Sequence, residues 1–291
     1  MRSEYKGVVL AGGQGTRLYP SSKVVSKQLM NVYDKPMIYY PLCTLMQAGI
    51  KEILIITSPE CIDQFKQLLG DGQQWGVSFS YEIQDNPNGL AEAFLISEEF
   101  LGDSPGCLIL GDNILYGNDL EKILRNAQNN TGATTFSYPV RDPERFGVIE
   151  YDGKRVISIE EKPTVPKSNR ASIGIYFFDK KAVEYAKQLT PSKRGELEIV
   201  DVWNHYLADG NMNVEHLNRE VTWLDAGTFD SLLLASNFIS TVEKVQSYKV
   251  GCPEEVSYRN GWISKEKLIS LSDSLLKSGY GKYLRSIVGE K

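Results

Sequence analysis

Apolar and polar positions in the first third of the chain fall into two patterns that follow one another. Runs such as Ile53–Thr57 are almost wholly apolar, which is typical of a strand buried on both faces. Between such runs the apolar residues recur at helical spacing, and Ser58 followed by Pro59 favours a helix that begins there. We expect strands at residues 8–10, 53–57, 77–83 and 107–110, and helices at residues 36–49, 58–69 and 90–101.

The middle of the chain has short strands in closer succession. Asp152-Gly153 between two of them is a strong hairpin signal. Helical spacing then returns, and Thr228 is suited to cap the last long helix. We expect strands at residues 134–140, 148–151, 156–160 and 172–178, and helices at residues 180–189, 197–208 and 229–245.

This order of elements predicts an α/β fold with a mostly parallel, mixed sheet and helices on both of its faces. Residues 1–245 show no linker, repeat or change of composition, so we expect them to form one domain. The polar stretch at 246–291 holds two short amphipathic segments and is expected to add a small helical appendage, suited to regulation or oligomerisation.

Composition and charge narrow the classes of protein. The chain has 291 residues, a net charge of −5 and no long basic segment, which argues against nucleic acid as a partner. No stretch approaches the roughly 18 apolar residues of a membrane span, and the few residues before the first strand leave no room for a signal peptide. The four cysteines lack metal-binding spacing, so we expect reduced thiols and a cytoplasmic protein.

The strongest local signal is the glycine-rich loop that follows the first strand. The glycines of Gly12–Gly15 let the backbone turn sharply and present amide groups to a ligand. Arg17 and Lys27 add positive charge, and residues 10–33 include no acidic residue. A glycine loop in a cationic segment favours a bound polyphosphate.

Other glycine loops fit less well. A dinucleotide-binding loop would have a third glycine where Leu18 stands. A P-loop would have Gly-Lys-Ser/Thr where this chain has Gly15-Thr16-Arg17. A plain glycine-rich turn remains the alternative interpretation.

Two aspartates are candidate metal ligands. Asp112 follows the strand at 107–110, so it should lie at the same sheet edge as the glycine loop. Asp225 follows a short apolar run and precedes a helix. Mg²⁺ takes one or two carboxylates together with substrate phosphates. An aspartate in a turn is an equal alternative for Asp112, and a helix cap is the alternative for Asp225.

Weaker signals lie elsewhere on the chain. Lys162 ends a strand, and the proline after it should keep it extended, aimed at the same crevice. Arg194 opens a helical segment, and Gly147 closes a charged turn. Gln84 and Gly89 could read the edge of a base through an amide and a bare backbone. Each of these residues could instead belong to an ordinary solvated loop or strand end.

The residue types together indicate phosphoryl or nucleotidyl transfer. Such reactions need mainly positioning and neutralisation of negative charge. A phosphate nucleophile is already anionic and needs no general base, which agrees with a chain that has only two histidines.

Several longer segments occur in an order that points to one family. These are residues 11–18 (AGGQGTRL), 33–42 (YDKPMIYYPL), 88–91 (NGLA), 111–117 (GDNILYG), 143–147 (PERFG), 160–163 (EEKP), 166–169 (PKSN), 194–202 (RGELEIVDV), 223–228 (WLDAGT) and 252–255 (CPEE). Over essentially its whole length the chain resembles the glucose-1-phosphate thymidylyltransferases of the sugar nucleotidyltransferase family.

The resemblance implies a Rossmann-like nucleotide-binding core with a sugar-binding β region inserted at about 135–225. It implies Mg²⁺-dependent transfer of dTMP from dTTP to glucose 1-phosphate, giving dTDP-glucose and pyrophosphate on the route to dTDP-rhamnose. It also implies a homotetramer.

The resemblance assigns roles to individual residues. The catalytic residues would be Arg17, Lys27, Asp112, Lys162 and Asp225, with Mg²⁺ on Asp112 and Asp225. The nucleotide would lie against Leu10, Gly12, Gly13, Gly15, Thr16, Arg17, Lys27, Gln84, Gly89 and Asp112. The sugar phosphate would lie against Asn113, Gly147, Glu161, Lys162, Ile173, Tyr176 and Arg194. A regulatory nucleotide, dTDP-rhamnose, would bind near Tyr116, Gly117, Arg219, Glu255 and Arg259.

The chain departs from the family pattern at a few positions. Phe146 replaces a frequent tyrosine near the sugar, and Asn118 and Glu220 replace a usual histidine and glycine near the regulatory site. UTP or another hexose 1-phosphate is an alternative substrate, because only a few contacts around the base and the sugar discriminate between such substrates. A catalytically silent nucleotide-sensing subunit is the alternative of a different class, although the full set of charged residues argues against it.

Overall fold

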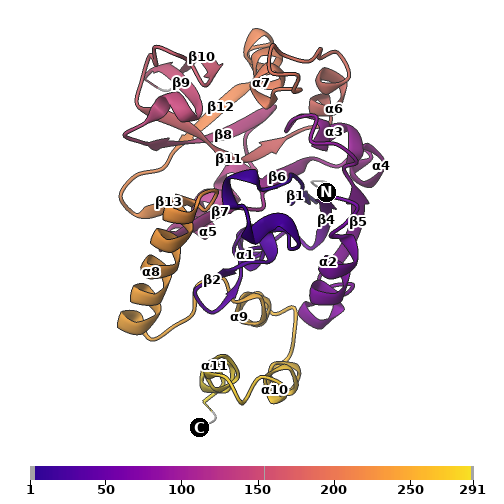
Figure 1. Cartoon of the computed structure of the whole chain (residues 1–291), viewed down its shortest axis with the longest axis vertical. Coiled ribbons are helices and arrows are strands. Elements are labelled where there is room, and N and C mark those ends of the chain that lie inside the picture. Colours follow the sequence, from indigo (N-terminus) through magenta and orange to yellow (C-terminus); the bar gives the residue numbers. More distant parts are fainter. Residues whose placement is uncertain (1–3, 154, 290–291) are drawn as a thin grey trace.

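The computed structural model describes residues 4–153 and 155–289. Its centre is a nine-stranded sheet in the order β10-β9-β11-β6-β1-β4-β5, with β8 and β12 branching from β11 (Figure 1). The strands of this sheet are β1 (Lys6–Leu10), β4 (Glu52–Thr57), β5 (Ser78–Ile83), β6 (Gly106–Leu110), β8 (Ala133–Pro139), β9 (Gly147–Asp152), β10 (Arg155–Glu161), β11 (Arg170–Phe178) and β12 (Met212–His216).

The first half of the sheet is parallel. β1 lies between β4 and β6, and Val9 is in register with Ile55 on one side and with Ile109 on the other. The carboxyl ends of parallel neighbours meet at one edge of the sheet, and Gly111 N donates to Leu10 O there at 2.9 Å. The glycine loop and the Asp112 segment therefore lie side by side, as predicted.

The second half is mixed. β11 runs antiparallel to β6, β8 and β9, and β10 and β9 form a hairpin around the predicted turn at Asp152-Gly153. β12 is parallel to β8. The sheet is thus mixed, with its parallel strands on the side that carries the glycine loop.

Helices cover both faces because alternate strand residues point to opposite sides. Val9 and Ile55 pack with one set of helices, whereas Val8 and Leu54 pack with the other. The first set is α1 (Tyr39–Gln47), α2 (Ile62–Leu69) and α5 (Leu120–Ala127). The second set is α3 (Glu92–Ile96), α4 (Glu98–Leu101), α6 (Lys181–Ala186) and α7 (Ile199–Ala208).

Two predicted helices differ from the observed ones. α2 begins at Ile62 rather than at Pro59, because residues 58–61 close a separate turn through a backbone hydrogen bond of 3.1 Å. The helix expected at 90–101 is divided into α3 and α4 at Ser97, whose buried hydroxyl donates to a nearby backbone carbonyl at 3.3 Å. A serine that binds local backbone in this way competes with a continuous helix.

The remaining elements surround the sheet. α8 (Phe229–Gln246) begins at the predicted cap, where Thr228 Oγ1 accepts from Ser231 N at 3.2 Å. The sequence analysis did not foresee the ribbon of β7 (Asn113–Gly117) and β13 (Val221–Asp225). A second small ribbon joins β2 (Asn31–Val32) to β3 (Lys35–Pro36).

The C-terminal region forms three helices where the sequence suggested two amphipathic segments. They are α9 (Pro253–Arg259), α10 (Lys265–Asp273) and α11 (Gly279–Ile287), at the bottom of Figure 1. α9 attaches them to the main body, since Ser257 Oγ donates to Trp75 O at 2.6 Å and Asn260 Nδ2 donates to Met46 O at 2.9 Å. Within the described part of the chain, no helix has the length and apolar character that crossing a membrane requires.

Candidate active site and a second pocket

The ribbon of β7 and β13 brings two carboxylates together. Asp225 at the end of β13 is in register with Asn113 at the start of β7, next to Asp112. Ala226 N donates to Asp112 O at 3.1 Å and fixes the two segments against each other. The two candidate metal ligands are therefore neighbours although they are far apart in the sequence.

Lys27 pairs with the first of these carboxylates. It lies on a turn of 3-10 helix, and its Nζ is 2.5 Å from Asp112 Oδ2. Burial opposes the charged form of Asp112, but the Lys27 ammonium outweighs it and holds the pKa of this carboxyl below its usual value. Asp112 is therefore an ionised, buried acceptor.

The surroundings of Asp225 have the opposite effect. Burial and the nearby charge of Asp112 raise the pKa of Asp225, and Arg17 and Lys27 oppose that rise. The Arg17 guanidinium lies over Gly227, where an added Cβ would come within 2.9 Å of its Nη2. Arg17 thus lies near the Asp225 carboxylate, since the same added Cβ would come within 3.1 Å of Asp225 Oδ1.

The donor set fits a magnesium ion. The charge of Asp112 raises the pKa of its neighbour Asp225, and a divalent cation between two such carboxylates would stabilise both in the ionised form. In the described residues no group of three or more His, Cys, Asp or Glu side chains is arranged to hold a metal. Mg²⁺ does not need one, because it takes one or two carboxylates with substrate phosphates and water.

The carboxylates open into a cavity of about 640 Å³ between the glycine loop and the mixed half of the sheet. Most of the residues predicted for catalysis and sugar binding line it, together with Thr16 from the predicted nucleotide set. These are Thr16, Arg17, Asp112, Asn113, Gly147, Glu161, Lys162, Tyr176, Arg194 and Asp225.

The far wall of this cavity carries a cluster of charges. Glu161 Oε1 lies 3.3 Å from Lys162 Nζ and 3.6 Å from Arg194 Nη1. Arg194 also reaches Glu198 at 3.3 Å. Burial raises the pKa of Glu161 despite its two cationic neighbours. The cluster thus holds two cations in place at the wall of the cavity.

The backbone at Lys162 contradicts the sequence prediction. Lys162 is not extended but has a φ of +44°, in the left-handed region. Its N–H donates to Phe146 O at 3.0 Å, so the chain turns to continue the ladder beyond β10. This conformation costs a side-chain-bearing residue about 1 kcal/mol, and such strain is concentrated at functional sites.

Asn113 occupies a more internal position than the other residues of the cavity. Its Nδ2 donates to Asp112 Oδ1 at 3.1 Å, and its Oδ1 accepts from Trp223 Nε1 at 2.6 Å and from Gly174 N at 3.2 Å. Asn113 therefore fixes the Asp112 carboxylate and joins three strands. Its contact with a sugar phosphate stays a prediction.

A smaller hollow of about 330 Å³ lies on the other side of the glycine loop and is lined by Gly13 and Gln84. An added Cβ at Gly12 would meet Gln84 Oε1 at 2.6 Å. Gly89 has a φ of +117°, and a Cβ there would meet the backbone of Leu197 at 2.4 Å. Glycine is required at 89, where the backbone segments approach one another, and at 12 it leaves room for the Gln84 amide.

Three other residues predicted for substrate binding do not line either cavity. Leu10 and Ile173 are buried in the core on either side of the sheet. Gly15 has a φ of +58° and its carbonyl accepts from Ser22 Oγ at 2.6 Å, so it shapes the loop. The sequence analysis missed Arg145 and Trp223 as lining residues of the larger cavity. Arg145 stands in the charged turn before Gly147, which was the available signal.

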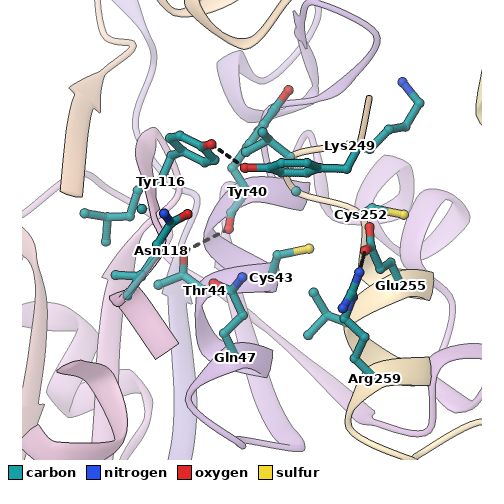
Figure 2. A pocket seen from close by; sticks show the side chains of 17 residues that line it. Tyr40, Cys43, Thr44, Gln47, Tyr116, Asn118, Lys249, Cys252, Glu255 and Arg259 are labelled. Atoms are coloured by element: carbon teal, nitrogen blue, oxygen red, sulfur yellow. Dashed lines mark hydrogen bonds and ion pairs between the residues drawn. The ribbon is translucent and has the colours of Figure 1, made fainter. Parts of the chain in front are cut away.

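A separate pocket of about 320 Å³ lies between α1, β7 and α9 (Figure 2). Tyr116, Gly117, Glu255 and Arg259, four of the residues predicted for a regulatory site, line it, and their binding of a nucleotide stays a prediction. Arg219 does not line it: it is exposed on the turn between β12 and β13. The Tyr116 hydroxyl lies within hydrogen-bond distance of that of Tyr248, and Glu255 Oε1 pairs with Arg259 Nη2 at 2.7 Å. Figure 2 shows Glu255 and Arg259 side by side on α9.

Comparison with known proteins relates this geometry to a family. A profile described as nucleotidyl transferase matches residues 6–242. The chain belongs to this nucleotidyl transferase family. The chain is 55% identical over 281 residues to a glucose-1-phosphate thymidylyltransferase of Neisseria meningitidis. The alignment covers 96% of this chain and 98% of that relative. It is 50% identical over 284 residues to a protein of the same name from Mycobacterium tuberculosis, covering 97% and 99%.

Solved structures of known proteins have the same fold. A Bacillus anthracis protein described as a glucose-1-phosphate thymidylyltransferase, in complex with sucrose, is 43% identical with a TM-score of 0.75, over 80% of this nucleotidyl transferase and 94% of that chain. A UDP-glucose pyrophosphorylase complexed with UDP-glucose has a TM-score of 0.72 at 24% identity, over 82% and 99% of the two chains, a likeness of fold alone. The predicted family and α/β fold are confirmed.

Proposed function

We propose that this nucleotidyl transferase is a glucose-1-phosphate thymidylyltransferase, which transfers dTMP from dTTP to glucose 1-phosphate and releases pyrophosphate. The observation that carries the proposal is the convergence of Arg17, Asp112 and Asp225 on one cavity whose far wall holds further cations. Lys27 does not line this cavity but pairs with Asp112 from behind. The names of relatives at 50–55% identity over nearly the whole chain support the choice of substrates.

The chain's own residues supply position and charge. Arg17 and Lys27 face the triphosphate on the glycine-loop side and stabilise the charge that grows on it. Lys162 and Arg194 hold the phosphate of the sugar on the opposite wall. An oxygen of that phosphate then attacks the α-phosphorus in line with the departing pyrophosphate, and no proton transfer is required.

We propose that Asp112 and Asp225 hold Mg²⁺ and that Asn113 orients the first of them. When bound, Mg²⁺ neutralises phosphate oxygens and so favours both attack and departure. The pairing of Lys27 with Asp112 keeps that carboxylate ionised, as a metal ligand must be.

The remaining roles follow from the family proposal. The pocket of Tyr116 and Glu255 would bind dTDP-rhamnose as a feedback ligand, and residues 246–291 would form a regulatory and oligomerisation region of a homotetramer. The enzyme would act in the cytoplasm, on the route to dTDP-rhamnose. The position of this pocket against α9, the first of the C-terminal helices, supports the arrangement.

Pyrophosphate release, measured for several nucleoside triphosphates against several hexose 1-phosphates, tests the proposal. We expect dTTP with glucose 1-phosphate to give the highest kcat/KM and removal of Mg²⁺ to abolish turnover. Lys27→Met and Asp112→Asn should each lower kcat by about 10²–10³-fold, whereas Lys122→Met on the exposed face of α5 should not. A preference for UTP would replace the substrate assignment, and no turnover with any pair would favour a nucleotide-sensing subunit.

A further inference from the structure

The side-chain amide of Gln84 is held from behind by a carboxylate. Gln84 follows β5, is 6% exposed, and lines the smaller hollow beside the glycine loop. Its Nε2 donates to Glu92 Oε2 at 2.7 Å and, more weakly, to Gly89 O at 3.4 Å. The other oxygen of Glu92 accepts from Asn88 Nδ2 at 2.8 Å. Glu92 itself does not line the hollow.

This contact decides which end of the amide faces the glycine loop. A carboxylate accepts hydrogen bonds and cannot donate them, so only the nitrogen end of Gln84 can point toward Glu92. The oxygen end is then turned the other way, toward the glycine loop, where an added Cβ at Gly12 would meet Gln84 Oε1 at 2.6 Å. Gln84 Oε1 is therefore a hydrogen-bond acceptor held at a fixed position beside the glycine loop.

We propose that Glu92 is a positioning residue for base selection: by locking the Gln84 amide it makes the nucleotide site select a base with an N–H at its pairing edge. Thymine and uracil carry N3–H, which can donate to Gln84 Oε1. Cytosine has a lone pair on N3, which would face the lone pairs of the same oxygen. The inference rests on the proposed function, because it takes a pyrimidine nucleotide as the ligand.

A merely structural role for Glu92 has different consequences. Glu92 is the first residue of α3, and a carboxylate there stabilises the helix N-terminus. Losing that contribution would lower the melting temperature but would leave discrimination between bases unchanged. The ratio of affinities for two bases therefore separates positioning from structural support.

The test measures the Kd values of dTTP and dCTP by calorimetry, so that it does not depend on turnover. We expect Glu92→Ala to lower the preference for dTTP over dCTP by about tenfold, the effect of freeing one buried hydrogen-bonding group to turn. Glu92→Gln should keep the preference, because its Oε1 still accepts from Gln84 Nε2. Glu99→Ala, an exposed glutamate of α4, is the matched control and should also keep it.

A double-mutant cycle assigns the effect to Gln84. In a Gln84→Ala background, Glu92→Ala should cause no further change in the preference. The inference is overturned if Glu92→Ala alters only the melting temperature, or if it changes the preference equally with and without Gln84. Wild-type protein that binds both nucleotides but supports no turnover would refute the proposed function and leave this comparison intact. Failure of wild type to bind either nucleotide would refute both.

Discussion

Asp112 and Asp225 are identical side chains in one site, yet their surroundings change their acidity in opposite directions. Lys27 overcomes the burial of Asp112 and lowers its pKa, whereas burial and the charge of Asp112 raise the pKa of Asp225. The two pKa values differ because the Lys27 ammonium pairs with Asp112, 2.5 Å away, and not with Asp225. A cation bound by both carboxylates would favour the ionised form of each and so reduce the difference between their pKa values, which agrees with the proposed magnesium site.

His216, also at the scale of a residue, makes stability depend on pH. It ends β12, and its Nδ1 lies 2.6 Å from Ser137 Oγ. Burial and the nearby Arg170 lower its pKa from 6.5. Below pH 6.5, His216 therefore binds a proton in the unfolded chain more readily than in the folded chain. We expect the free energy of unfolding to fall as the pH drops through this range and His216→Gln to reduce that fall.

Urea unfolding at several pH values between neutral and mildly acidic measures the effect. His205→Gln on α7 retains His216 and is the matched control, which should show the wild-type pH dependence. If His216→Gln and His205→Gln change the slope equally, the buried ring of His216 is not the cause.

At the scale of elements, the end of α8 is fastened by a buried network of charges. Glu243 accepts from Lys35 Nζ and from Lys249 Nζ, each at 2.8 Å, and from Val250 N at 3.0 Å. Asp34 pairs with both lysines. The network joins the turn between β2 and β3 to the segment that leads into α9, so it determines how the C-terminal helices attach.

Removing the central carboxylate should be costly. Glu243→Ala leaves Lys35, which is 3% exposed, with one partner in place of two. We expect a loss of about 3–5 kcal/mol in the free energy of unfolding, the cost of breaking a buried pair from one side. Glu121→Ala breaks an exposed pair with Arg125 within α5 and should cost about 0.5 kcal/mol or less. Chemical denaturation of both variants gives the comparison, and similar losses would show that the network is unimportant.

At the scale of the whole molecule, two pockets lie on different parts of one fold. The larger cavity opens between the halves of the sheet, whereas the pocket in Figure 2 lies where α9 meets α1. β7 contributes to both, since Asn113 at its start lines the first and Gly117 at its end lines the second. One strand therefore connects the proposed catalytic and feedback sites.

A variant at the second pocket tests whether feedback acts through a site separate from the catalytic one. The Arg259 side chain is 70% exposed and pairs with Glu255, so Arg259→Ala should change stability little. We expect it to raise the concentration of dTDP-rhamnose needed for half-inhibition at least about tenfold, through loss of a charge-assisted contact with phosphate. Arg125→Ala is the exposed control. Inhibition equal to wild type in Arg259→Ala, or competition by dTDP-rhamnose with dTTP alone, would contradict feedback through this pocket.

The sequence by itself determined the order of the main strands and helices of the sheet, the glycine loop and the position of Asp112 at a strand end. These depend on local periodicity and on the rule that parallel strands end at one edge, so they need no knowledge of distant contacts. Its longer motifs also sufficed to predict the family.

Only the tertiary structure decided how distant segments complete the site. Pairing of β7 with β13 brings Asp225 to Asp112, and no local pattern specifies that partner. The ladder contact with Phe146 turns Lys162 into a left-handed conformation that its following proline did not predict. The Glu92 carboxylate sets the direction of the Gln84 amide in the same way. Each is a hydrogen bond or charge between segments, whose energy depends on three-dimensional proximity.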